Sequence, residues 1–439
     1  MRRLGWMVGW VTLLVGACFA GEPEMLATEA VQAIGKDSGW VVVDTRKSGV
    51  YNGWTLEDAR GGHIPGARNF SAQWLGADDA RLNDDLSMRG ITPEKKILLY
   101  DTNGSDARQV ARFLMERGFD NVSLYDAKGW VENASLPLEV LPHYELVVPA
   151  HVVKAVMDGE RPKEFHGMGR LMVVEASWGP ESGSYAKGHL PGAFHINTDL
   201  IEPPSKGEPQ MWMLAGDKHL AEFALNHGFT RDATVILSSA EPLAAYRVAT
   251  VLKYIGVEDV RVLDGGDEAW TRAGYTLETK RHEPVAVEDF GGPIPGNPHV
   301  MDTLPEVRQS LKSSSTFTLV DNRTWKEHIG ADSGYSYHKK AGRIPGSVYG
   351  YAGKKNAYSM EYFRNPDNTM REPEVFLKLW KDQGIDVNSH LSFMCGSGWR
   401  VAEIYYYAAV AGLKDISIFS DGWIGWSNTP GCPVVTGCP

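Results

Sequence analysis

The chain has 439 residues, of which 43% are hydrophobic and 23% are charged, a composition typical of soluble globular proteins. This length exceeds what one ordinary hydrophobic core accommodates, so we expect roughly two to four domains. The formal net charge of −11 argues against nucleic acid as a partner, because phosphate binding requires a basic face. A single local cationic pocket would still suffice for a small anionic substrate.

Residues 1–20 have the pattern of an export signal. Arg2 and Arg3 precede an apolar run, residues 4–17, that is too short to cross a membrane as a helix. Cleavage after Ala20 would release a periplasmic protein. In a second interpretation the sequence around Cys18 is a lipoprotein signal, and Cys18 would carry a lipid anchor. Both interpretations predict an exported protein without a membrane span.

Three cysteines remain in the mature chain: Cys395, Cys432 and Cys438. An odd number of cysteines in an oxidising compartment leaves at least one thiol unpaired. Cys432 and Cys438 are close in sequence beside the C-terminus, and we predict a local disulfide between them. Cys395 would then stay free, as a nucleophile requires.

Three sequence landmarks recur in the same order three times along the chain, which predicts three similar domains. The first is a β-branched strand that ends in an acidic residue, at residues 41–46, 173–177 and 319–323. The second is a Gly/Pro turn, at residues 62–67, 188–193 and 342–347. The third is a strand–loop–helix–strand unit that ends in an acidic Gly/Trp segment, at residues 97–130, 235–270 and 391–426.

The repeats place domain 1 at residues 25–141, domain 2 at 146–282 and domain 3 at 297–436, with proline-containing linkers between them. Within each third landmark the apolar residues change from a strand-like run to helical spacing, and a short strand follows. This β–α–β alternation predicts an α/β fold in which each domain has a central parallel sheet flanked by helices.

The Asp-x-Arg strand end, the Gly-His-Ile-Pro-Gly-Ala turn, a Cys-led loop and an acidic Gly/Trp segment, in this order, resemble the rhodanese family. Three such domains behind a signal peptide are similar to the periplasmic triple-rhodanese proteins of that family. The resemblance covers essentially the whole mature chain. It implies three tandem rhodanese-like domains and a sulfurtransferase activity.

The candidate substrate-binding loop of domain 3 begins at Cys395 and continues through Gly396, Ser397, Gly398, Trp399 and Arg400. Its two glycines let the backbone curl so that several N–H groups can face one anion. The helix beginning near Arg400 adds its positive end, and Ser397 can donate a further hydrogen bond. These groups favour a thiolate and, equally, the terminal sulfur of a persulfide. We therefore predict that Cys395 is the catalytic nucleophile.

The other two domains have no cysteine at the equivalent position, which is Ser238 in domain 2 and Tyr100 or Asp101 in domain 1 when the copies are counted without gaps. Carrying sulfane sulfur requires a soft nucleophile that can hold it as a persulfide. We therefore predict that domains 1 and 2 are inactive. They would serve as a scaffold or as walls of a substrate channel.

The expected reaction moves sulfane sulfur from thiosulfate or a related anionic donor to a thiol or cyanide. The persulfide on Cys395 is covalent, so no cofactor is predicted. One alternative is a 3-mercaptopyruvate sulfurtransferase, since such enzymes share the Cys-Gly-Ser-Gly opening. Another is a sulfur-relay or binding module that exchanges sulfur with a partner protein. A cysteine phosphatase or arsenate reductase is disfavoured, because the span from Cys395 to Arg400 is one residue shorter than in their loops.

Three further expectations concern single residues. Arg323, from the third Asp-x-Arg segment, is a candidate substrate ligand, with a structural ion pair as the alternative. Trp399 either lines the pocket mouth or packs against another domain. Glu327 stands where tandem sulfurtransferases commonly have a substrate-binding arginine, which leaves the identity of the donor open. The histidines show no metal-ligand spacing, and we predict no metal site.

Overall fold

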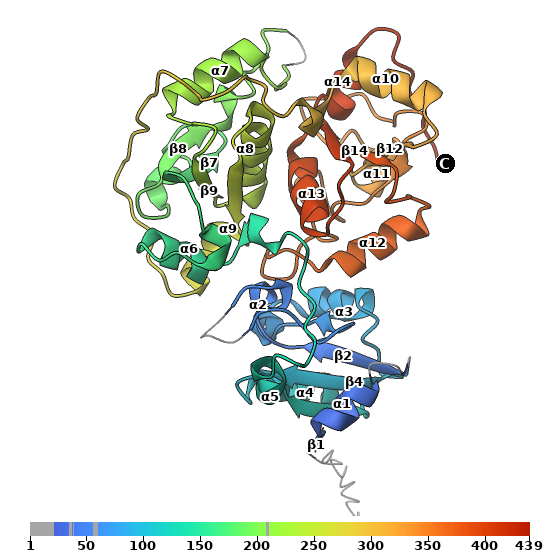
Figure 1. Cartoon of the computed structure of the whole chain (residues 1–439). Helices are drawn as coiled ribbons and strands as arrows, with labels where there is room; N and C mark the ends of the chain where they lie inside the picture. Colours follow the sequence, from blue (N-terminus) through green and yellow to red (C-terminus); the bar gives the residue numbers. More distant parts are fainter. Residues whose placement is uncertain (1–21, 35–36, 38, 56–59, 208–209) are drawn as a thin grey trace, which may run out of the picture.

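Three five-stranded sheets, one in each domain, form the framework of this computed structural model (Figure 1). The structure describes residues 22–34, 37, 39–55, 60–207 and 210–439. The predicted signal peptide and Cys18 therefore lie outside the described residues. Within the described ranges, no helix has the length and apolar character needed to cross a membrane.

All paired neighbours in the three sheets are parallel, and the strand orders are β1-β5-β4-β2-β3, β6-β10-β9-β7-β8 and β11-β15-β14-β12-β13. The order is the same in each domain when strands are counted within it. The strands of domain 1 are β1 Glu24–Met25, β2 Trp40–Asp44, β3 Arg68–Asn69, β4 Lys96–Asp101 and β5 Val122–Asp126. Those of domain 2 are β6 Val147–Val148, β7 Leu171–Ser177, β8 Phe194–Asn197, β9 Thr234–Ser238 and β10 Asp259–Leu263. Those of domain 3 are β11 Met301–Asp302, β12 Phe317–Asp321, β13 Val348–Tyr349, β14 His390–Met394 and β15 Ile416–Phe419.

Helices connect the strands and cover the sheets (Figure 1). In domain 1 they are α1 Thr28–Ile34, α2 Ser48–Asn52, α3 Asp79–Met88, α4 Asp106–Met115 and α5 Lys128–Glu132. In domain 2 they are α6 Ala150–Met157, α7 Asp217–Asn226, α8 Pro242–Ile255 and α9 Gly266–Arg272. In domain 3 they are α10 Leu304–Ser313, α11 Trp325–His328, α12 Pro373–Asp382, α13 Trp399–Val410 and α14 Gly422–Asn428. The predicted fold class, three α/β domains with parallel sheets, is confirmed.

The central strands read as continuous apolar runs because helices cover both faces of each sheet. Val235, Ile236 and Leu237 of β9, for example, are all fully buried. The following helix, α8, begins with Pro242. Proline suits this position because the first N–H groups of a helix have no hydrogen-bond partner within it. The helix ends at Ile255 and is capped by Gly256 in the left-handed conformation. Local sequence therefore determines where this strand and helix begin and end.

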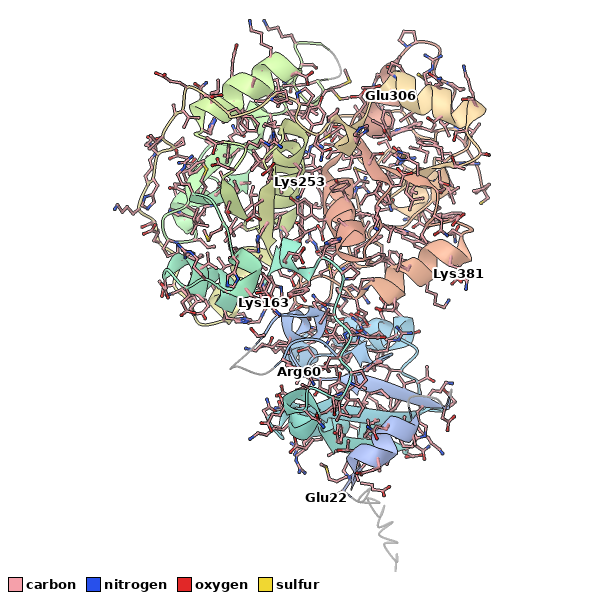
Figure 2. All side chains as sticks on the ribbon, in the orientation of Figure 1. Glu22, Arg60, Lys163, Lys253, Glu306 and Lys381 are labelled. Atoms are coloured by element: carbon pink, nitrogen blue, oxygen red, sulfur yellow. The ribbon has the colours of Figure 1, made fainter. Side chains whose placement is uncertain are left out.

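Domains 2 and 3 pack side by side through their longest helices, α8 and α13 (Figure 1). The ring of Tyr246 on α8 lies 5.5 Å from the rings of both Tyr406 and Tyr407 on α13. Figure 2 shows Lys253 at this boundary, where its ammonium lies 5.7 Å from the centre of the Tyr406 ring. One hydrophobic core runs through both domains, so the two domains form a single packed unit.

Domain 1 lies below this pair and has its own hydrophobic clusters (Figure 1). Its α3 helix reaches domain 3 through ionic contacts. Arg89 bonds Glu372 at 2.7 Å, and Asp84 contacts Lys354 at 2.5 Å. Charged side chains, of which Arg89 and Glu372 are buried, therefore join domain 1 to domain 3.

Candidate active site

Cys395 lies at the carboxyl end of β14, at the start of the loop that leads into α13. Its side chain is buried, with 1% of the residue exposed. The carbonyls of Cys395 and Gly396 accept hydrogen bonds from the backbone N–H groups of Trp423 and Ile424 at 2.8 and 3.0 Å. These two bonds hold the loop against the start of α14.

Two glycines let other side chains approach this loop closely. A Cβ atom on Gly396 would overlap the hydroxyl of Tyr335. Gly398 caps α13 with a φ of 93°, in the left-handed region, and a Cβ atom there would lie 2.7 Å from Nη1 of Arg247. Gly398 is thus required both for its conformation and for the contact with Arg247.

Arg400 is buried in the first turn of α13 and is paired with Glu327. Its Nη1 and Nη2 donate to the two carboxylate oxygens of Glu327 at 2.9 Å each, and Nη2 also donates to the Tyr335 hydroxyl at 3.0 Å. Burial alone would raise the pKa of Glu327, but the Arg400 guanidinium outweighs it and holds that pKa below its ordinary value. Glu327 therefore neutralises the charge of Arg400, and the role of Arg400 in substrate binding stays a prediction.

Arg323 is fully buried and bonds within domain 3. Its Nε and Nη2 donate to the Asp321 carboxylate at 2.8 and 2.7 Å, and Nη2 also donates to the Gly342 carbonyl at 2.9 Å. The guanidinium lies 4.8 Å from the centre of the Trp423 ring. The structural ion pair is confirmed, and the role of Arg323 as a substrate ligand stays a prediction.

Trp399 is half-buried and packs against domain 2. Its indole N–H donates to Oε2 of Glu202 at 2.6 Å. Oε1 of Glu202 accepts from Nε and Nη2 of Arg247, at 2.8 and 2.6 Å. The sequence analysis did not identify Glu202 and Arg247, because a contact between two domains produces no periodic pattern in the sequence of either domain.

A row of aromatic side chains, the aromatic rim, extends from the Cys395 loop to the surface and comprises Trp178, Trp212, Tyr335, Tyr337 and Tyr358. Ring centres along it are 5.4 Å apart for Tyr335 and Tyr337, 5.6 Å for Tyr337 and Trp212, and 6.1 Å for Trp212 and Trp178. Tyr358 lies 6.4 Å from Tyr335. Trp178 and Tyr358 are each 64% exposed, so the rim is open to solvent.

Acidic groups accompany the aromatic rim. The indole N–H groups of Trp178 and Trp212 both donate to Asp199 at 3.1 Å. Burial raises the pKa of the Tyr335 hydroxyl well above its ordinary value, although Arg400 opposes this, so the hydroxyl stays protonated near neutral pH. Tyr335 therefore places a neutral phenol against the loop that carries Cys395.

Strand register identifies the positions equivalent to Cys395 in the other domains. Cys395 follows the residue paired with Asp321, and the matching residues are Asp101 in domain 1 and Ser239 in domain 2. In each domain the carbonyl of this residue accepts a hydrogen bond from a backbone N–H in the segment after the next strand. The distance is 2.8 Å for Cys395, 2.8 Å for Asp101 and 3.1 Å for Ser239. The assignment of Ser238 is therefore wrong by one residue, because counting without gaps ignores a difference in loop length.

The cysteines near the C-terminus are both unpaired in the structure. Cys432 is half-buried beside the core of domain 3, whereas Cys438 is exposed. Hydrogen bonds of Val435 with Arg343 and of Gly437 with Ile329 tie the intervening segment to the domain. The predicted disulfide between Cys432 and Cys438 is not formed, since the two thiols have different surroundings.

Domain 2 contains a cluster that sequence spacing did not reveal. Ligand atoms of His189, Glu278 and His282 lie within 4.8 Å of one another. The pairing of His189 with Glu278 recurs in domain 1, where Nε2 of His63 lies 3.5 Å from Glu139. Each of these histidines stacks on a tyrosine of its own domain. The histidine–glutamate pair is therefore a structural feature that domains 1 and 2 share.

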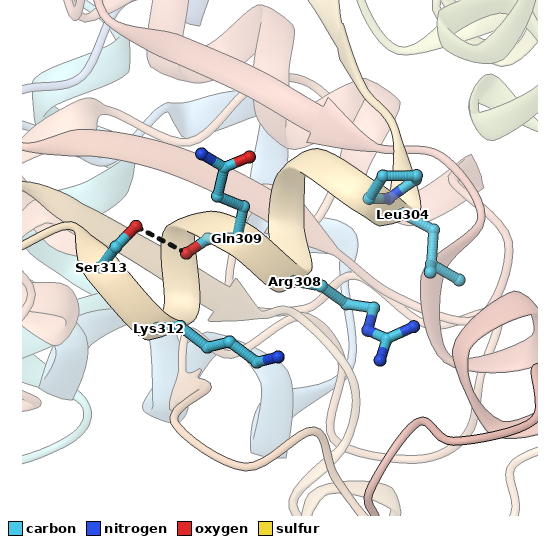
Figure 3. A pocket seen from close by; sticks show the side chains of 6 residues that line it. Leu304, Arg308, Gln309, Lys312 and Ser313 are labelled. Atoms are coloured by element: carbon cyan, nitrogen blue, oxygen red, sulfur yellow. Dashed lines mark hydrogen bonds between the residues drawn. The ribbon is translucent and has the colours of Figure 1, made fainter.

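An open pocket of about 540 Å³ lies along α10, whose residues are distant in sequence from the Cys395 loop (Figure 3). It is lined by Leu304, Pro305, Arg308, Gln309, Lys312 and Ser313. All six belong to one helix face, and no residue of the Cys395 loop contributes. The pocket is therefore not part of the candidate site.

Known proteins that resemble this chain are sulfur-transfer proteins. The family model of the Rhodanese-like domain matches residues 26–132, 162–273 and 303–429. Thiosulfate sulfurtransferase YnjE of Escherichia coli (strain K12) is 35% identical, in a match that covers 100% of this chain and 98% of YnjE.

Two solved structures are similar over nearly the whole chain. One is the anaerobic ergothioneine biosynthesis enzyme of Chlorobium limicola with its natural substrate trimethyl histidine, and the other is EanB with a cysteine persulfide in a tetrahedral intermediate state with ergothioneine. Each is 33% identical with a TM-score of 0.87, in matches that cover 95% of this chain and 100% of the other. The chain belongs to the rhodanese family of sulfurtransferases.

Proposed function

We propose that the protein transfers sulfane sulfur through a persulfide on Cys395. The observation that carries this proposal is the position of a buried thiol between the end of β14 and the start of α13. The positive end of the helix and the N–H groups of the loop favour an anionic sulfur there. The similarity to EanB with a cysteine persulfide supports the same chemistry.

The proposed reaction has two steps. The Cys395 thiolate attacks the sulfane sulfur of the donor, an S–S bond forms, and the bond between that sulfur and the rest of the donor breaks. With thiosulfate, sulfite leaves with the electron pair and Cys395 becomes a persulfide anion. A nucleophilic acceptor then attacks the outer sulfur, and Cys395 leaves as a thiolate. Cyanide is converted to thiocyanate in this way, and a thiol is converted to a persulfide.

Thiosulfate remains our proposed donor, on the similarity to YnjE. The arginines around the loop are each paired with a carboxylate: Arg400 with Glu327, Arg323 with Asp321, and Arg247 with Glu202. Neutral or protein-bound donors therefore compete with thiosulfate. A 3-mercaptopyruvate donor and a protein-to-protein sulfur relay remain the alternatives.

A second candidate acceptor is a cationic organic molecule. The aromatic rim extends outward from the Cys395 loop, and the Asp199 carboxylate accepts from Trp178 and Trp212 along it, whereas the guanidinium groups of the nearby arginines are paired with carboxylates. Aromatic faces bind quaternary ammonium groups through cation–π attraction. The similar Chlorobium limicola enzyme is described with trimethyl histidine, which carries a quaternary ammonium group. Sulfur transfer to the imidazole ring of such a molecule would form a bond between a ring carbon and the outer sulfur of the persulfide. The ring carbon would lose its proton, and Cys395 would leave as a thiolate.

Purified protein with each donor and acceptor tests these proposals. Initial rates with thiosulfate and with 3-mercaptopyruvate, each with cyanide as acceptor, give kcat/KM values that rank the donors. The persulfide form is then mixed with trimethyl histidine, and the products are analysed by mass spectrometry. Turnover with thiosulfate supports the proposed donor. Turnover only with a persulfidated partner protein would replace the enzyme proposal with the relay.

We also propose a periplasmic location, on the pattern of residues 1–20. N-terminal analysis of the protein exported by bacterial cells decides between the two signals. Cleavage after Ala20 gives the soluble form. A lipid on Cys18 identifies the anchored form, and an intact N-terminus in the cytoplasm contradicts export.

A further inference from the structure

Two buried charged side chains of domain 2, Glu202 and Arg247, reach across the domain boundary to domain 3. Besides its bonds to Glu202, Arg247 donates through Nη2 to Oγ of Ser420 at 2.7 Å. Glu202 in turn holds the indole of Trp399. We call Glu202, Arg247, Trp399 and Ser420 the interdomain bracket. Two of its residues come from each domain.

The interdomain bracket holds the Cys395 loop on two sides. Trp399 is the first residue of α13 and directly follows Gly398, the last loop residue before the helix. Ser420 directly follows β15 and precedes the segment in which the N–H of Trp423 donates to the carbonyl of Cys395. Fixing Trp399 and Ser420 therefore fixes both segments that define the path of the loop.

The Arg247 guanidinium also contacts the turn of the loop directly. A Cβ atom on Gly398 would lie 2.7 Å from Nη1 and 3.0 Å from Cζ of Arg247. Nη1 itself is buried and, among the described residues, has no hydrogen-bond partner. A buried charge pair with an unused donor costs free energy that an apolar pair of similar volume would avoid. Stability alone does not account for this arrangement.

We propose that Glu202 and Arg247 are positioning residues for sulfur transfer, so that domain 2, which has no thiol of its own at the equivalent position, completes the active site of domain 3. This inference rests on the proposed function of Cys395. Arg247 holds the turn at Gly398 and the segment at Ser420. Glu202 holds the Trp399 indole in a fixed orientation. The geometry around the Cys395 thiol thereby depends on contacts from another domain.

The same interface offers a matched control. Arg364 is buried and donates to Glu403 on α13 through Nε and Nη2, both at 2.7 Å, and to Glu241 of domain 2 at 2.9 Å. This is a buried arginine–glutamate pair within domain 3, and the contact of Arg364 with Glu241 extends it across the interface to domain 2. Among the described residues, neither the Arg364 nor the Glu403 side chain bonds to residues 395–398. Its removal disturbs the interface without touching the loop.

The test compares Arg247→Met/Glu202→Gln with Arg364→Met/Glu403→Gln in the full-length chain. Both are made with Cys432→Ser and Cys438→Ser, which leave Cys395 as the single thiol of the described residues. Two rates are measured: alkylation of Cys395 by iodoacetamide, and persulfide formation from thiosulfate in a single turnover. We expect persulfide formation to slow by roughly ten- to a hundredfold in the first variant, the effect typical of losing groups that orient a site. Alkylation changes several-fold, and the control stays within about twofold of the parent.

Equal slowing in both variants would overturn the proposal, because it would reduce the interdomain bracket to a stability element. Rates within about twofold of the parent in the first variant would also overturn it. If that variant does not fold, Arg247→Lys takes its place. Lysine keeps the positive charge but lacks the guanidinium group that bonds both Glu202 and Ser420. A parent protein that accepts no sulfur from thiosulfate, 3-mercaptopyruvate or inorganic polysulfide would refute the proposed function, and the alkylation rates would still decide whether domain 2 shapes the loop.

Discussion

The loops that follow the central strands of domains 1 and 3 share a backbone arrangement but differ in chemistry. Asp101 and Cys395 occupy the same position, and each gives its carbonyl to an N–H at the start of the last helical segment of its domain. In domain 1 the Asp101 carboxylate accepts the loop's own N–H groups, from Gly104 at 3.0 Å and Ala107 at 2.9 Å. In domain 3 the residue at this position is Cys395, which has a thiol in place of the carboxylate. The fold thus supplies a turn rich in N–H donors, and the residue at its start decides what the turn binds.

Ser239 in domain 2 is a third outcome of the same arrangement. Its hydroxyl donates at 2.5 Å to the carbonyl of Glu241, the N-cap residue of α8, and so bonds within its own loop. Domain 2 nevertheless contributes to the neighbouring site through Glu202 and Arg247. A domain without the nucleophile therefore need not be only a scaffold.

The largest expected effect is that of Cys395→Ser on sulfur transfer. Without a thiol no persulfide forms, and we expect activity to fall by roughly a thousandfold or more, as is typical when a nucleophile is removed. Thermal denaturation should show nearly unchanged stability, because serine has a similar shape. Cys438→Ser is the control and keeps full activity. Retained transfer in Cys395→Ser would refute the role of this residue.

Glu327→Gln should have the next largest effect. Removing one partner of a buried ion pair leaves the Arg400 charge uncompensated, which costs about 3–5 kcal/mol of unfolding free energy. Denaturant unfolding measures this loss. Glu268→Gln serves as the control, since its pair with Arg272 is largely exposed and worth at most about 1 kcal/mol. A loss as small as in the control would mean that Arg400 does not depend on Glu327.

Gly398→Ala tests the contact of the loop with Arg247. The substitution adds both left-handed strain and a steric overlap, so we expect it to destabilise by about 2–4 kcal/mol. Gly384 has a φ of 76°, and a Cβ atom there would have no other atom within 4 Å, so Gly384→Ala carries the strain alone, about 1 kcal/mol. The difference in denaturation midpoint between the two variants measures the overlap. Equal midpoints would contradict the close approach of Arg247.

Asp101→Ala should show the smallest effect, on stability alone. It leaves the N–H groups of Gly104 and of the buried Ala107 without their acceptor, at a cost of about 1–3 kcal/mol. Sulfur-transfer rates should be unchanged, because the thiol lies in domain 3. A parallel loss of transfer activity would show that the domain 1 loop also takes part in the reaction.

Features encoded in local patterns could be predicted from the sequence. Strand and helix periodicity, the repeated Gly/Pro turns and the glycines around Cys395 led to three parallel-sheet domains and to the candidate loop. These features depend on neighbours in the chain. They therefore leave a signal within a few residues.

Features that depend on distant residues could not be predicted. Arg400 looks like a free cation until Glu327, 73 positions away, is seen to pair with it. Tyr335 and Arg247 approach the loop from other segments, and the turns of domain 2 shift the equivalent position from Ser238 to Ser239. The Cys432–Cys438 disulfide was inferred from spacing, but spacing does not determine how the C-terminal segment binds to Ile329 and Arg343.

The most direct test of the central claim is to locate the transferred sulfur. The full-length protein is incubated separately with thiosulfate, 3-mercaptopyruvate and inorganic polysulfide, and its peptides are then analysed by mass spectrometry. We expect one added sulfur atom on Cys395, none on Cys432 or Cys438, and its loss on adding cyanide. Sulfur found only on Cys432 or Cys438, or no added sulfur with all three donors, would contradict the assignment of Cys395 as the sulfur carrier.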